Sequence, residues 1–325
     1  MKVPRRRFLK LAGIAAAAPA LPRLGLALDY PVRPVRWVVG YPPGGPQDIV
    51  ARLMGQFLSE RFGQQFIVEN RSGAGGNIGA EAVINAPPDG YTMLLVGSPN
   101  AINATLYEKL NFVFLRDIAP VASIGRVPLV MEVHPSVPAK TVPEFIAYAK
   151  ANPAKINYAS AGNGTPQHVA AELFKMMTGV NMLHVPYRGA APAVTDMISG
   201  HVQVMFDPMP TAIEQIKAGR LRGLAVTTVK RSEVLPDLPT VGDSLPGFAA
   251  DTWYGAGVPR NTPVEIVEAL NREINAVLGD ARVKARLADL GATVLVGTPA
   301  DFGRMLADET EKWGRVVRAS GAKPE

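Results

Sequence analysis

Short apolar segments alternate with amphipathic segments along most of this 325-residue chain. The apolar segments at 35–40, 66–69 and 92–96 have the length and composition of buried strands, whereas residues 48–62 and 76–85 repeat their apolar positions with helical spacing. Strands that alternate with helices are typical of a parallel sheet with helices packed on its faces. The first third of the chain therefore predicts one α/β unit.

A second series of the same kind begins at Leu129 and ends near Thr227. We predict its strands at 129–131, 183–185, 202–206 and 221–227, and its helices from 141, at 165–177 and at 192–199. A proline-rich crossover at 231–247 leads to a strand at 253–258, helices at 264–278 and 281–290, a strand at 293–296 and a last helix from 299. Two α/β lobes joined by crossovers account for this order, and the cleft between such lobes is the default ligand site.

Two helix starts carry the residues of a capping box. Thr141 is followed three residues later by Glu144, and Thr262 by Glu265 with Pro263 between them. In such a box the threonine hydroxyl accepts from the helix and the glutamate reaches back to the threonine N–H. We expect Pro263 at the first helical position.

The first 27 residues read as an export signal. Consecutive arginines at Arg5, Arg6 and Arg7 precede a short apolar run that is broken by prolines, and a small residue, Ala27, suits signal peptidase. The pattern predicts a twin-arginine signal peptide cleaved after Ala27 and a periplasmic mature protein. The alternatives are a basic N-terminal arm or an uncleaved anchor. No other apolar run approaches the roughly 18 residues that a membrane helix needs.

Charge and composition then narrow the function classes. The chain has 34 Lys+Arg against 28 Asp+Glu, but six of the basic residues precede Leu28, so the predicted mature protein is formally neutral. Lysines and arginines are scattered, which argues against a nucleic-acid partner. The chain has no cysteine, which excludes disulfides and cysteine-ligated metals, and its four histidines lack metal-ligand spacing. We expect no metal and no cofactor.

Glycine-bearing loops lie between a strand and a helix at 41–48, 73–79, 160–168 and 184–192. Each can offer backbone amides and a helix start to an anion. The first is not a phosphate-binding loop, because no Gly-Lys-Ser/Thr follows, and an ordinary turn is its alternative. The second imitates a dinucleotide fingerprint but has Ile78 where glycine or alanine is required, which favours a tight turn near the cleft.

An enzymatic alternative rests on Ser160, His168 and Asp207 as nucleophile, base and orienting acid of a hydrolase. Ser160 does not lie in a Gly-x-Ser-x-Gly elbow, which argues against it. His168 can instead bond a loop carbonyl from the first helical turn. Arg188 offers a fork suited to carboxylates, with a solvated surface position as its alternative.

The order of motifs resembles a known family, the Bug-type periplasmic receptors of tripartite tricarboxylate transporters. The resemblance covers about residues 30–321. It is carried by Tyr41-Pro42-Pro43-Gly44-Gly45 with Asp48, Asn70-Arg71-x-Gly73-Ala74-Gly75-Gly76, Asp89-Gly90-Tyr91-Thr92, Asp117-Ile118-Ala119-Pro120-Val121, Ser160-x-Gly162-x-Gly164-Thr165 with His168, His184-Val185-Pro186-Tyr187-Arg188-Gly189, Leu224-Ala225-Val226-Thr227, Leu238-Pro239-Thr240-Val241 and Trp253-Tyr254-Gly255. Gly242-Asp243 departs from the pattern, which has an acidic residue one place earlier.

The resemblance implies a type II periplasmic-binding fold whose two lobes close by hinge motion on a small organic acid. Lobe I would comprise 28–127 and 246–325, and lobe II 128–245, each a mostly parallel sheet flanked by helices. The ligand-binding residues that it implies are Tyr41, Pro43, Gly44, Gly45, Asp48, Ser98, Asn100, Ser160, Asn163, Gly164, Thr165, His168, Tyr187, Arg188, Gly189, Ala190 and Asp207.

The function that follows is an extracytoplasmic solute receptor without catalysis. It would bind a di- or tricarboxylate or a related acid as a monomer and deliver it to the small and large membrane subunits of a tripartite transporter. The alternatives are the periplasmic hydrolase that uses Ser160 and His168, and a receptor that signals to a membrane sensor.

Overall fold

A computed structural model describes residues 29–153, 155–320 and 322–324. Residues 31–325 pack as one compact unit. The predicted export signal and its cleavage site after Ala27 lie outside the described residues and stay predictions. Within the described residues, no helix combines the length and the hydropathy that a membrane span requires.

The first sheet has three parallel strands at one edge and antiparallel strands beside them. β1 pairs in parallel with β2 and β3, and β9 lies antiparallel between β3 and β4. β10 pairs antiparallel with β4. The bounds are β1 Val35–Val39, β2 Phe66–Asn70, β3 Thr92–Gly97, β4 Ile118–Val133, β9 Asp251–Pro259 and β10 Thr293–Val294.

The second sheet continues from the far end of β4. β5 pairs in parallel with β6 and β7, and β4 joins them by antiparallel pairing with β7 and β8. The bounds are β5 Asn157–Ser160, β6 Leu183–Pro186, β7 Val204–Pro208 and β8 Arg222–Val226. The predicted α/β class with parallel strands flanked by helices is confirmed, and the antiparallel centre of each sheet was not predicted.

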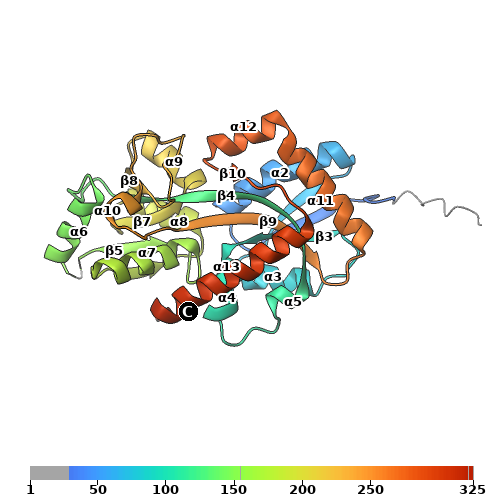
Figure 1. Cartoon of the computed structure of the whole chain (residues 1–325), viewed down its shortest axis with the longest axis horizontal. Helices are drawn as coiled ribbons and strands as arrows, with labels where there is room; N and C mark the ends of the chain where they lie inside the picture. The colour runs from blue at the N-terminus through green and yellow to red at the C-terminus, as the bar shows by residue number, and fades with distance from the viewer. Residues whose placement is uncertain (1–28, 154, 321, 325) are drawn as a thin grey trace, which may run out of the picture. The chain divides into compact units, whose positions relative to one another are not determined.

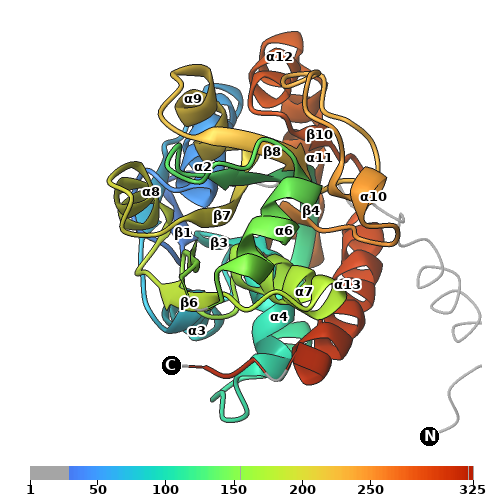
Figure 2. The ribbon, with the colours of Figure 1, turned by 90° about the vertical axis from the view of Figure 1, so that its left-hand side faces the viewer.

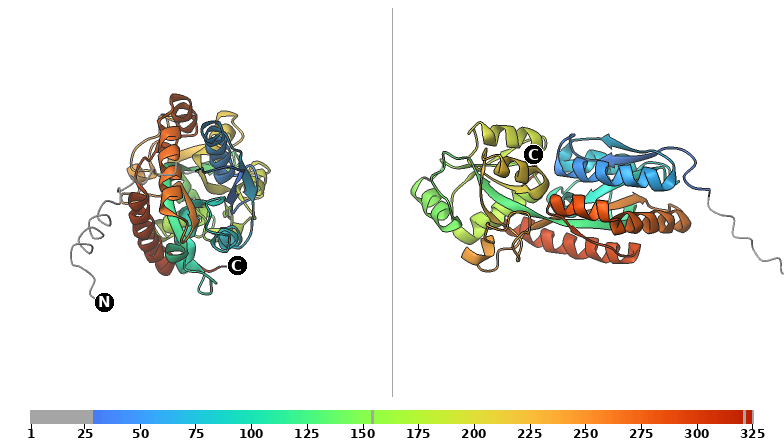
Figure 3. Two further views of the ribbon diagram at one scale, coloured as in Figure 1. Left: turned by 90° about the vertical axis from the view of Figure 1, so that its right-hand side faces the viewer. Right: turned by 90° about the horizontal axis from the view of Figure 1, so that it is seen from above.

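Helices cover both sheets (Figure 3). Those of the first sheet are α2 Pro46–Phe62, the 3₁₀ turn η1 Ala74–Gly76, α3 Asn77–Ile84, α4 Ser98–Leu106, α5 Phe114–Asp117, α11 Val264–Gly279, α12 Ala281–Asp289 and α13 Pro299–Ser320. Those of the second sheet are α6 Val142–Ala151, α7 Pro166–Thr178, α8 Ala190–Ile198, α9 Met209–Lys217 and α10 Val241–Ser244. α13 packs against α4 and β4 and also reaches α7.

The strand β4 belongs to both sheets. Its residues 118–128 pair with β9, and residues 129–133 pair with β7. Figure 1 shows β4 and β9 side by side between the two groups of helices. Only the last part of β4 was predicted as a strand, because Pro120 and Pro128 interrupt the pattern of a regular strand. The predicted lobe boundary at 127/128 falls within β4 and stays a prediction.

Helices lie on both faces of the second sheet (Figure 2). Successive side chains of each strand point to opposite faces, so each strand can pack against helices on both sides. Phe206 of β7 points toward α7, where its ring centroid is 5.5 Å from that of Phe174. Its neighbour Met205 packs on the other face with Ala193 and Met197 of α8. Both faces are therefore buried, as parallel strands require.

The helix starts agree only in part with the predicted capping boxes. Thr141 accepts from the N–H of Glu144 at 3.3 Å, but the Glu144 carboxylate accepts from Lys140 and not from Thr141. The second box is wrong: the N-cap of α11 is Pro263 itself, and the Thr262 hydroxyl donates to the carbonyl of Pro259. Proline at the N-cap displaces threonine from the position that the box needs.

A capping box does form at α10, inside the predicted crossover. Thr240 accepts from the N–H of Asp243 at 3.0 Å, and the Asp243 carboxylate accepts from the N–H of Thr240 at 3.1 Å. The hydrogen bonds from Thr240 lower the pKa of Asp243. The acidic residue that departs from the family pattern therefore has a local structural role.

Candidate functional site

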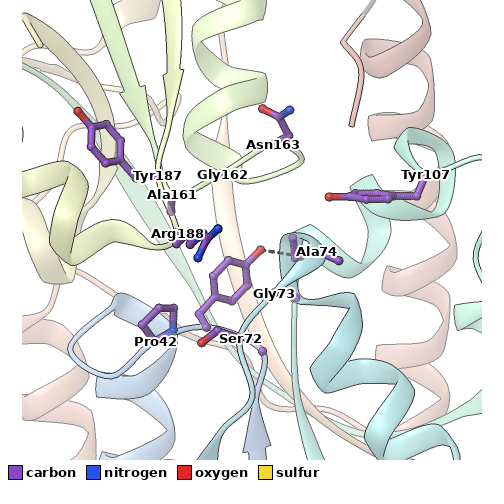
Figure 4. Close-up of a pocket in the computed structure, with 14 residues that line it drawn as sticks. Pro42, Ser72, Gly73, Ala74, Tyr107, Ala161, Gly162, Asn163, Tyr187 and Arg188 are labelled. Carbon is purple, nitrogen blue, oxygen red and sulfur yellow. Dashed lines mark hydrogen bonds between the residues drawn. The ribbon is translucent and has the colours of Figure 1, made fainter. Parts of the chain in front are cut away.

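A cavity of about 420 Å³ lies between loops of the first sheet and loops of the second (Figure 4). The loops follow β1, β2, α4, β5 and β6. The lining residues are Gly40, Tyr41, Pro42, Ser72, Gly73, Ala74, Gly75, Gly76, Tyr107, Ala161, Gly162, Asn163, Tyr187 and Arg188. Four of the predicted binding residues are among them: Tyr41, Asn163, Tyr187 and Arg188.

A left-handed turn forms the wall of the cavity on the first-sheet side. Residues 73–76 all have positive φ, including Ala74 at 48°, a conformation that is uncommon for a residue with a side chain. The carbonyl of Gly75 accepts from the Tyr41 hydroxyl and from the Asn103 amide, both at 2.8 Å. Because the protein itself uses this carbonyl, the turn has mainly N–H groups to offer to a ligand.

Arg188 is the single charged side chain among the described residues that line the cavity. It is exposed and makes no hydrogen bond or ion pair within the described part of the chain. In Figure 4 it points into the space between the two sets of loops, and Tyr107 lies on the opposite side. Arg188 is therefore exposed to solvent, as one interpretation of the sequence expected, and its guanidinium can also reach a ligand in the cavity.

Tyr187 contributes its backbone and not its hydroxyl. The hydroxyl donates to Asp196 at 2.6 Å, and the ring points away from the cavity in Figure 4. Burial and the bond to Asp196 raise the pKa of Tyr187 to about 12. The phenol therefore anchors the loop after β6 to α8, and the neighbouring Arg188 takes its place from that anchor.

The predicted residues of the first loop shape the cavity from outside. Asp48 accepts from the N–H of Gly44 at 3.0 Å and also from Arg52 and Asn70. Burial raises the pKa of Asp48, but these hydrogen bonds outweigh it and hold the pKa below its usual value. Pro43, Gly44 and Gly45 do not line the cavity.

Ser98 and Asn100 stabilise the start of α4. The Ser98 hydroxyl is buried, lies 3.1 Å from the hydroxyl of Thr252 and accepts from the N–H of Trp253 at 3.1 Å. The Asn100 side chain accepts from the N–H of Gly97 at 2.9 Å. Asn100 also borders a small hollow that shares Tyr41 with the main cavity.

The Ser160–His168 pair of the hydrolase hypothesis does not form. The Ser160 hydroxyl is 2.6 Å from Nε2 of His184, whereas Nδ1 of His168 accepts from the N–H of Gly164. The two imidazoles stack with centroids 4.3 Å apart. Burial lowers the pKa of His168 to about 4 and that of His184 to about 3, so both are neutral near pH 7. This stack supports the loop 160–165 from behind, and His168 bonds an N–H and not a carbonyl.

Asp207 lies behind the cavity and does not face it. It is fully buried, and its carboxylate accepts from the hydroxyl of Thr211 and from Gln167. Burial raises the pKa of Asp207 to about 7. The equally buried Glu132 is its neighbour, and burial together with Asp207 raises the pKa of Glu132 as well. Burial thus favours the protonated form of both carboxyls. Asp207 is absent from the cavity lining in the described chain, and Nδ1 of His168 is bonded to Gly164 and not to Asp207, so Asp207 is not the orienting acid of the hydrolase hypothesis.

Glycines let the two sets of loops approach each other. A Cβ at Gly189 would lie 2.9 Å from the ring of Pro42, and a Cβ at Gly164 would overlap the side chain of Asn103. Beside them, the Thr165 hydroxyl donates to the carbonyl of Gly162 at 2.7 Å, and Ala190 begins α8. Gly164, Thr165, Gly189 and Ala190 therefore position the cavity walls without lining them.

Several lining residues were not among the predicted binding residues. The turn 72–76 carried the signal, since it lies after a strand, before a helix and within a motif of the resemblance, but it was interpreted only as a tight turn near the cleft. Ala161 and Gly162 lie inside a loop that was predicted. Tyr107 follows the end of α4 and gave no sequence signal.

The chain is similar to known proteins over nearly its whole length. Residues 50–322 match the model of the tripartite tricarboxylate transporter family receptor. Protein BugT of Bordetella pertussis is 37% identical, over 98% of both chains. Among solved structures, R. palustris Rpa4515 with adipate has a TM-score of 0.89 and 38% identity, over 91% of this chain and 100% of that one.

A second solved structure, MatC from Rhodopseudomonas palustris with bound malate, has a TM-score of 0.84 and 32% identity, over 89% of this chain and 100% of that one. These similarities span both sheets and the loops of the cavity, and they confirm the two-lobed periplasmic-binding fold. They also favour a binding protein over an enzyme. The chain belongs to the receptor family of the tripartite tricarboxylate transporters, whose members are periplasmic.

Proposed function

We propose that this protein is a receptor that binds a small organic carboxylate in the cavity between its two sheets. The observation that carries the proposal is the composition of the cavity wall: one charged side chain, Arg188, among backbone amides and uncharged residues in the described chain. A guanidinium pairs with a carboxylate through two parallel N–H groups. The relatives that were solved with adipate and malate hold acids of this class.

The cavity suits an acid better than a cation or a neutral solute. No acidic side chain belongs to its described lining, and the acids nearby, Asp48 and Asp207, are bonded to other groups. The turn 73–76 lies on the side opposite the loop of Arg188, and because the Gly76 N–H donates to the carbonyl of Gly73, we propose the N–H groups of Gly73, Ala74 and Gly75 as the ones that a ligand would use. Anions with two polar ends therefore have a partner at each wall.

Delivery of the ligand to a transporter would depend on closure of the two lobes around it. We propose that lobe I (28–127 and 246–325) and lobe II (128–245) move together around the ligand, and that the small and large membrane subunits of a tripartite transporter recognise the closed form. The twin-arginine signal would deliver the chain to the periplasm, and cleavage after Ala27 would release it as a monomer.

A titration of acids against their neutral analogues tests the proposal. We expect adipate, malate or citrate to raise the melting temperature of the purified protein and to bind in calorimetry, whereas adipamide does not. Specific binding stabilises the folded state in proportion to the logarithm of ligand concentration. If neutral amides bind as well as the acids, or if the whole series of mono-, di- and tricarboxylates leaves the melting temperature unchanged, the proposal is wrong.

A further inference from the structure

Asn163 lies where three segments of the chain meet. It lines the ligand cavity. Its backbone carbonyl is 3.1 Å from the position that a Cβ would take on Gly75, across the line where the first-sheet loops meet the second-sheet loops, which we call the seam. Its side-chain amide donates to the carbonyl of Lys323 at 3.1 Å. One residue of the second-sheet loop therefore lies close to the first sheet's turn on one side and is hydrogen-bonded to the C-terminal segment on the other.

The C-terminal segment, defined here as residues 322–324, follows α13. α13 packs along α4, and the Thr105 hydroxyl of α4 fits against Gly314. The segment and the end of α4 together line a groove of about 740 Å³, which has Tyr107 in common with the ligand cavity. The segment is thus attached to the first-sheet side, while its bond to Asn163 reaches the second-sheet side.

The bond fixes which way the Asn163 amide points. A backbone carbonyl can only accept, so the NH₂ group must face Lys323 and Oδ1 must face away. That Oδ1 is buried and has no hydrogen-bond partner among the described residues. A buried acceptor without a partner is unfavourable, so the amide would turn to reach water if the C-terminal segment did not hold it.

We infer that the C-terminal segment is a latch: through the carbonyl of Lys323 it positions Asn163 at the cavity and holds the two sides of the cavity together. The inference rests on the proposed function only for its effect on ligand affinity. Opening of the seam between Gly75 and Asn163 must break this hydrogen bond, so the latch slows ligand release. One such bond corresponds to about a three- to tenfold change in the dissociation constant.

A truncation tests the latch. A chain that ends after Ser320 lacks the carbonyl, whereas Lys323→Ala keeps it and removes only the side chain. We expect the truncation to raise the dissociation constant of adipate about three- to tenfold by faster release, and Lys323→Ala to leave it within twofold. Asn163→Ala, which removes the donor without adding a charge to the cavity, should match the truncation, and the two changes combined should add nothing further.

A second readout needs no ligand. The chain has no cysteine, so a Lys150→Cys, Lys284→Cys double variant can be spin-labelled on exposed sites of α6 and α12 alone. We expect the truncation to broaden the label distance distribution toward longer values, with circular dichroism unchanged. Unchanged distances together with unchanged adipate release would overturn the latch. If no carboxylate binds even the unaltered protein, the proposed function fails, and the distance measurement still decides the latch.

Discussion

The two walls of the cavity are built by different means. The first-sheet wall is a left-handed turn whose shape comes from backbone conformation and from bonds donated by Tyr41 and Asn103. The second-sheet wall carries the side chains Arg188 and Asn163 and is backed by a stack of neutral histidines. The first wall thus supplies shape and amides, whereas the second supplies charge. This difference predicts which substitutions abolish binding and which only weaken it.

The largest effect should come from the seam between the walls. Gly164→Ala places a Cβ against Asn103, and overpacking of this kind costs about 1–3 kcal/mol, so affinity should fall about 5- to 150-fold in calorimetry. Gly219→Ala is the matched control, because Gly219 has a similar φ of 69° but open space around its Cβ position. Equal losses of affinity in both variants would show that backbone strain, and not closure, is responsible.

Arg188 tests the charged wall. Arg188→Ala removes the one charge of the described lining, and because the guanidinium is exposed we expect about a tenfold loss of affinity, at the low end for a charge-assisted bond. The loss should shrink as salt is raised from 0.05 to 0.5 M. Arg315→Ala, at an exposed position of α13, serves as the control. An unchanged adipate or malate affinity would place Arg188 on the solvated surface only.

A pair of tyrosines compares the walls directly. Tyr41→Phe removes the bond that holds Gly75, and we expect about a fivefold loss of affinity, corresponding to about 1 kcal/mol. Tyr187→Phe removes a bond to Asp196 that points away from the cavity, and it should lower stability by a similar amount but affinity less than twofold. A larger affinity loss for Tyr187→Phe would reverse the assignment of the two walls.

The smallest effect is a pH dependence of stability from behind the second wall. Burial raises the pKa of Asp207 to about 7 from 3.8, so the folded state binds its proton more tightly than the unfolded state. This contribution is complete below about pH 4 and is lost as the pH rises through about 7. Asp207→Asn should flatten the fall in melting temperature between pH 4 and 7. A curve parallel to that of the unaltered protein would show that Asp207 ionises normally.

The alternation of strands and helices and the loops at strand ends could be predicted from periodicity. Periodicity does not show in which direction a strand runs in its sheet or where a polar side chain points. The antiparallel placement of β9 and the full length of β4 depend on partners far along the chain. Asp207 was correctly placed at a strand end, but its side chain turns into the protein because Thr211 and Gln167 bind it there. The turn 72–76 was not predicted to line the cavity, because Ile78 argued against a dinucleotide site. That argument does not exclude a small organic acid.

The shared strand β4 also has a mechanical consequence. Strand pairs twist more in a two-stranded ribbon than in a wide sheet, and β4 and β9 form such a ribbon at Val127 and Pro128, which pair with β9 alone among the described strands. The lobe closure that we propose would then be torsion of this unbroken ribbon. A torsional spring returns to its resting angle without a separate source of energy, so release of the ligand would reset the receptor for its next cycle.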